Sequence, residues 1–70
     1  MSQLVQDAEM PTLRRRWERL MFVQQLSYVT RATGQDETAV VERFAAMTLD
    51  DLRENLDPET FAKLCDMIGD

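Results

Sequence analysis

The side chains best suited to strong directional contacts are four clustered arginines, Arg14, Arg15, Arg16 and Arg19, which directly precede an apolar run over residues 20–23. A guanidinium binds a phosphate or a carboxylate through two parallel hydrogen bonds. At helical spacing Arg15, Arg16 and Arg19 lie within about 100° of one another, whereas Arg14 lies beyond the apolar stripe. The cluster predicts contact with an anionic group, either an acidic protein surface or nucleic-acid phosphate.

Residues suited to catalysis are few. The chain contains no histidine, no glycine-rich phosphate loop and no serine or cysteine in a nucleophile motif. Its one cysteine, Cys65, lies on the apolar stripe of a predicted helix, where a buried and unreactive thiol is expected. We therefore expect a protein that is not an enzyme, without catalytic or cofactor-binding residues and without a cofactor.

The acidic residues Asp50, Asp51 and Glu54 are the strongest candidates for metal ligands. Adjacent acids on a helix diverge by about 100°, and the spacing matches no calcium-binding loop. One cysteine and no histidine exclude the usual zinc ligand sets. The pattern is typical of a solvated first turn that favours the helix dipole, so no metal site is expected.

Nucleic-acid binding is the alternative function that the Arg14–Arg19 patch could serve. A helix-turn-helix would place residues 49–56 in the major groove, but that segment has three acids against Arg53 alone and would be repelled by phosphate. The net charge of the chain is −5, far from the basic footprint of DNA-binding domains. These charges disfavour nucleic acid as a partner, although the sequence leaves open a transcriptional regulator that uses these arginines on phosphates.

Charge is divided unevenly along the chain. Residues 1–34 have five arginines and three acids, whereas residues 35–70 have three basic residues and ten acids. Such asymmetry can mark an interaction surface, but in a small bundle the two halves can also pack together and satisfy each other.

The spacing of apolar residues predicts a single all-α domain over 1–70, a small bundle of one long helix and three shorter ones. Gly34, Asp36, Thr48 with Asp51, and Asp57 with Pro58 supply the helix boundaries. Residues 1–10 are expected to be either flexible or a short helix capped by Ser2. The long helix is predicted over about 11–33, and the shorter ones over about 36–47, 49–55 and 58–68.

The predicted core consists of the apolar residues that recur on one side of each helix. These are Leu13, Trp17, Leu20, Val40, Phe44, Leu52, Phe61, Leu64 and Ile68. A chain of 70 residues buries only about 60% of the surface that it exposes when unfolded, so association is the expected source of added stability.

The second half of the predicted long helix has a second apolar face, formed by Phe22, Val23, Leu26 and Val29. A helix that is apolar on two sides must be covered on both. These four residues are therefore the predicted surface for self-association or for a partner. Trp17, flanked by arginines, is the candidate hot spot, although a tryptophan on this face is more often a core residue.

Together these features predict a small protein-binding regulator, adaptor or inhibitor. It would dock on a protein partner as a homodimer, with Arg15, Arg16 and Arg19 contacting acidic groups of the partner. Acidic residues near the N-terminus, an unpaired thiol and no long apolar run predict a cytoplasmic protein without a membrane partner. The identity of the protein partner is not encoded in these patterns.

Overall fold

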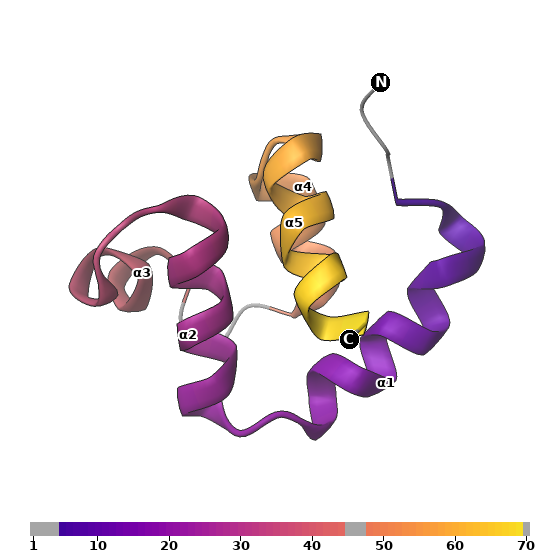
Figure 1. The fold of residues 1–70 in the computed structure, drawn as a ribbon, viewed down its shortest axis with the longest axis horizontal. Coiled ribbons are helices and arrows are strands. Elements are labelled where there is room, and N and C mark those ends of the chain that lie inside the picture. The colour runs from indigo at the N-terminus through magenta and orange to yellow at the C-terminus, as the bar shows by residue number, and fades with distance from the viewer. Residues whose placement is uncertain (1–4, 45–47, 70) are drawn as a thin grey trace.

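The fold is a bundle of short helices, described by a computed structural model over residues 5–44 and 48–69. No strand occurs within these ranges, so the all-α prediction is confirmed. Helix α5 lies at the centre and packs against α1, α2 and α4, while α3 packs on α2 (Figure 1). The elements are a 3-10 turn η1 (Asp7–Glu9), α1 (Met10–Arg19), α2 (Phe22–Thr33), α3 (Glu37–Phe44), α4 (Leu49–Asn55) and α5 (Pro58–Gly69).

The prediction of one continuous helix over about 11–33 is wrong. Leu20 and Met21 have extended backbones, with ψ angles of 144° and 155°, and they separate α1 from α2. The two helices meet at a sharp corner, at the bottom of Figure 1. The apolar periodicity continued through the break, and periodicity alone does not show where a helix ends.

Two adjacent glutamines provide the physical reason for the corner. The Gln24 side-chain oxygen accepts a hydrogen bond from the Met21 backbone N–H at 3.0 Å, which satisfies a donor at the start of α2. The Gln25 side-chain amide donates to the Trp17 carbonyl at 2.7 Å, in the last turn of α1. The Trp17 carbonyl also accepts from the Leu20 backbone N–H at 3.1 Å, so Gln25 adds a second bond there. Helix ends leave backbone groups without their full set of partners, and these two side chains offset part of the cost of the break.

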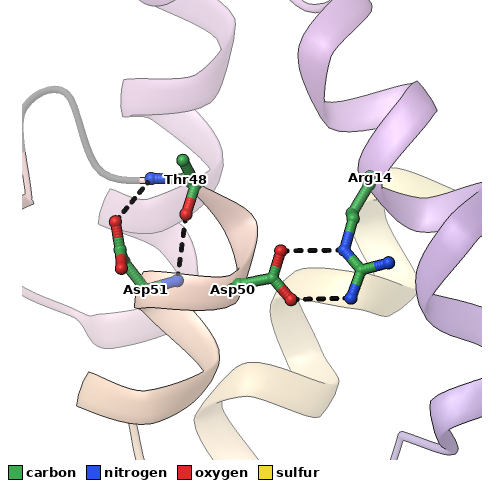
Figure 2. Close-up of polar contacts among 4 residues, drawn as sticks. All are labelled: Arg14, Thr48, Asp50 and Asp51. Carbon is green, nitrogen blue, oxygen red and sulfur yellow. Dashed lines mark hydrogen bonds and ion pairs between the residues drawn. The ribbon is translucent and has the colours of Figure 1, made fainter.

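The other helix boundaries follow the predicted signals. Gly34 ends α2 in the left-handed conformation, with φ at 73°. Asp36 accepts a hydrogen bond from the backbone N–H three residues ahead at 2.9 Å, and Asp57 accepts one at 3.2 Å. Thr48 and Asp51 form a reciprocal capping box with two bonds of 3.2 Å (Figure 2). Local side-chain chemistry thus sets these ends as expected.

The three shorter helices differ from their predicted ranges only at their ends. Residues 45–47, the predicted end of the second helix, lie outside the described residues, and so does Ser2, the predicted N-terminal cap. The predicted range 49–55 is observed as Leu49–Asn55.

The predicted core is largely confirmed. Leu20 and Phe44 are half-buried against it, and the other predicted core residues are buried. Met10 is buried as well, although its place next to Pro11 gave no signal for a core position. The N-terminal segment is attached to α4, because the Arg53 guanidinium donates to the Val5 carbonyl at 3.2 Å and pairs with Asp7 at 2.8 Å.

Gln25→Ala tests the role of the corner contacts. The substitution removes the hydrogen bond to the Trp17 carbonyl, and we expect it to lower the free energy of unfolding by about 1 kcal/mol. In a domain of this size that corresponds to a fall in Tm of roughly 4–8 °C. Thermal unfolding followed by circular dichroism measures it.

Ser27→Ala is the matched control, because Ser27 is exposed on the same helix. It should leave Tm unchanged or slightly raised, since alanine favours helix. Equal Tm values for the two variants would show that the Gln25 bond does not support the corner.

Candidate functional site

Three of the four large apolar side chains exposed among the described residues are grouped at the corner between α1 and α2. Met21, Phe22 and Val23 are exposed by 67%, 57% and 61%. We call these three residues the corner patch. Contiguous exposed apolar residues on a small protein are a mark of an interaction site.

The predicted binding face of Phe22, Val23, Leu26 and Val29 is divided by the structure. Phe22 and Val23 are exposed, but Leu26 and Val29 are buried in the core, so their assignment to an outer surface is wrong. The reason is that α3 and α5 both pack on α2 and cover its later turns. The two apolar faces of α2 are therefore covered within the chain, except in its first turn.

Phe22 lies on the same face of α2 as two core residues, but it is outside the core. Phe22, Leu26 and Val29 lie at positions i, i+4 and i+7, which share one face of a helix. Leu26 and Val29 are covered, whereas Phe22 is more than half exposed because α1 turns away at the corner. Phe22 is thus the uncovered end of a buried stripe.

A groove lies beside the corner patch, between α2 and α3. Its volume is about 400 Å³, and its walls are Val23, Leu26, Ser27, Thr30 and Arg31 of α2 with Glu37 of α3. Val23 therefore belongs to both the patch and the groove. An apolar side chain entering the groove would remain in contact with the patch.

The predicted arginine cluster is divided as well. Arg14 donates two hydrogen bonds of 2.8 Å to the two carboxylate oxygens of Asp50, in the bidentate geometry seen in Figure 2. Arg16 donates to the Gly69 carbonyl at 2.8 Å and caps the C-terminal end of α5. Both side chains are engaged within the molecule.

Arg15 and Arg19 remain available. Both are exposed, and they lie four residues apart on the face of α1 opposite the buried Trp17. Within the described part of the chain, neither forms an ion pair or a hydrogen bond. They are the two cations of the predicted cluster that a partner could contact.

Trp17 lies in the core with 5% of its surface exposed. It also borders a cavity of about 400 Å³ between α1 and α4, whose walls include Arg14 and Asp50. Burial favours the structural role for Trp17 over the predicted hot-spot role. The sequence could not distinguish the two roles, because both place tryptophan on the apolar face.

The described residues contain no group of three or more cysteine and acidic side chains that could hold a metal ion. The Cys65 thiol is buried in α5, and burial raises its pKa to about 12. A thiol with so high a pKa is a poor nucleophile. None of the described helices is long and apolar enough to cross a membrane.

The Arg14–Asp50 pair is testable by acid titration. The hydrogen bonds and positive charge of Arg14 hold the pKa of the Asp50 carboxyl below its usual range. In Arg14→Gln we expect the pKa of Asp50 to rise toward its ordinary value, as measured by carbon-13 NMR of the carboxyl carbons. Asp57 is the internal control, because the Thr60 hydroxyl and N–H, not an arginine, lower its pKa. A shift of both carboxyls, or of neither, would contradict the assignment.

Burial of Cys65 predicts a thiol that is protected in the folded protein. At mildly alkaline pH, alkylation should be slower by about a thousandfold than in the urea-unfolded chain, because the pKa is raised from 9.0 to about 12. The folded state retains the proton more strongly, so the contribution to stability is present below pH 9 and is lost as pH rises toward 12. Equal alkylation rates in the two states would exclude a buried thiol.

Comparison with known proteins gives no relative from which to transfer a function. No protein-family model, no curated protein and no solved structure matches the chain. The candidate site therefore rests on the corner patch, its groove and the two free arginines.

Proposed function

We propose that this chain is a non-enzymatic protein-binding regulator, adaptor or inhibitor that docks on a partner through the corner patch. The observation that carries the proposal is the exposure of three consecutive apolar residues, one of which ends a core stripe. Placing Met21, Phe22 and Val23 in water has an unfavourable hydration free energy that a partner surface would remove. Because the one thiol is unpaired, we place this activity in the cytoplasm.

The prediction of a homodimer rests on a long helix whose second half has a second apolar face. The corner interrupts that helix, and two of the four residues of the face lie in the core. This weakens the support for pairing of two long helices, and we favour docking on a different protein. Self-association stays a prediction that sizing over a range of concentrations tests.

Nucleic-acid binding through the arginine patch has less support than protein binding. Arg14 and Arg16 are engaged with Asp50 and the end of α5, which leaves two free cations in this patch, on a chain of net charge −5. Backbone-contacting proteins neutralise several phosphates to gain affinity. Steep salt-dependent binding of DNA or RNA, lost in Arg15→Glu/Arg19→Glu, would reverse the preference.

Substitution of the corner patch tests the proposal. We expect Phe22→Ser/Val23→Ser to reduce the capture of partner proteins from a lysate of the native host by at least about tenfold, since interface energy concentrates in a few anchors. Captured proteins are quantified by mass spectrometry against the unmodified protein.

Val41→Ser is the matched control, because Val41 is an exposed apolar residue on α3, outside the patch. Circular dichroism checks that all variants fold. A set of captured proteins that is the same for the corner variant and the control would remove the patch from partner binding.

A further inference from the structure

The charges nearest the corner patch indicate what kind of partner it fits. Arg19 is two residues from Met21, so their Cα atoms are at most about 7 Å apart. Arg15 is one helical turn behind Arg19, about 6 Å along α1. Two exposed arginines therefore lie on the last turns of α1, directly before the exposed apolar residues.

No carboxylate of the described residues forms an ion pair with Arg15 or Arg19. Glu18 is the nearest acid in sequence and lies about 60° from Arg15 and about 100° from Arg19 around α1, so it offsets part of the charge of Arg15 and leaves that of Arg19. Asp50 is held by Arg14. At the far side Arg31 and Glu37 line the same groove, so the charge there is balanced. The excess positive charge is therefore on the α1 side alone.

We propose that the partner segment is an amphipathic acidic helix of a different protein. Its apolar face covers the corner patch and enters the groove beside Val23, and its carboxylates pair with Arg15 and Arg19. This inference rests on the proposed function and adds the chemistry of the partner. Helix-in-groove recognition uses apolar anchors spaced by three and four residues, with charged residues at the rim.

A second copy of the chain fits this surface less well. A two-fold interface uses the same surface on both copies, so the one carboxylate lining the groove that it could offer to Arg15 and Arg19 is Glu37. A standard interface buries about 800 Å² on each partner, which is roughly a sixth of the 4924 Å² total surface of this chain. A patch of three side chains is a small part of such an area, but it suits a single helix.

An anionic membrane or nucleic acid also fits less well. Electrostatic binding to anionic lipid usually involves clusters of four to eight basic residues, roughly, whereas two are free here. The acidic remainder of the chain would be repelled by both surfaces, because residues 35–70 have three basic residues and ten acids. Two arginines suffice for bidentate pairing with two carboxylates.

Three designed helical peptides test the proposal by isothermal titration and NMR. They share one apolar face and differ only in their flanking residues, which are glutamate, glutamine or lysine. We expect the glutamate peptide to bind about fivefold more tightly than the glutamine peptide at low ionic strength, and the lysine peptide to bind most weakly. Backbone NMR shifts should be largest at residues 15–27.

Two double variants separate the charges from the patch. Arg15→Glu/Arg19→Glu should reverse the preference, so that the lysine peptide binds best. Arg43→Glu/Lys63→Glu changes the net charge equally at exposed positions on α3 and α5, and it should keep the preference for glutamate. Phe22→Ser should weaken the binding of all three peptides.

The remaining outcomes overturn the proposal in distinguishable ways. Equal binding of the three peptides, lost in Phe22→Ser, would remove the charge preference and keep the patch as a protein-binding surface. Binding of none of them would exclude an amphipathic helix as the ligand, while lysate capture would still test the proposed function. Concentration-dependent dimerisation that blocks the patch would assign it to a second copy, and binding to phosphatidylserine vesicles but to no peptide would assign it to a membrane.

Discussion

The fold depends on the interruption of the first apolar helix at Leu20 and Met21. A straight helix over residues 11–33 would be about 34 Å long, longer than the 31 Å greatest extent of the whole molecule. The longest of the later helices, α5, has 12 residues and would leave part of so long a helix uncovered. By turning at the corner, α1 and α2 can both pack against α5 and enclose one core. The break exposes backbone groups at two helix ends, and Gln24 and Gln25 satisfy one at each end.

Contacts between the two halves of the chain use a small part of its uneven charge. Arg14 pairs with Asp50 and Arg16 caps α5, so two cations of the first half are used by groups of the second. Arg53 of the second half holds Val5 and Asp7 of the first in return. These exposed contacts join α1 to α4 and α5 but contribute little to stability. Arg14 and Arg16 are therefore engaged within the molecule, whereas Arg15 and Arg19 are free. The spacing of the four arginines in the sequence could not distinguish these two pairs.

The features that could be predicted from the sequence are those that depend on contacts between residues close together in the chain. The caps at Asp36, Thr48 and Asp57 and the left-handed Gly34 involve contacts within a few positions, and these predictions were correct. The corner was not predicted, because glutamine is a common surface residue of helices. Its presence does not indicate that its side-chain amide forms a hydrogen bond across a helix break. Leu26 and Val29 were assigned to the wrong surface because their burial depends on which helices pack on α2. Those contacts join residues that are far apart in the chain, and apolar periodicity does not identify them.

The corner patch follows from the same geometry as the corner itself. Phe22 continues the buried stripe of Leu26 and Val29, but the turn of α1 leaves the first turn of α2 without a covering helix. Core packing accounts for the later members of the stripe and gives no reason for an aromatic residue at its exposed end. Solubility alone would favour a polar residue there, as it does at the neighbouring Gln24. Contacts within the chain explain neither the uncovered Phe22 nor the two free arginines. These features follow one another along the chain, and one acidic amphipathic partner would satisfy both.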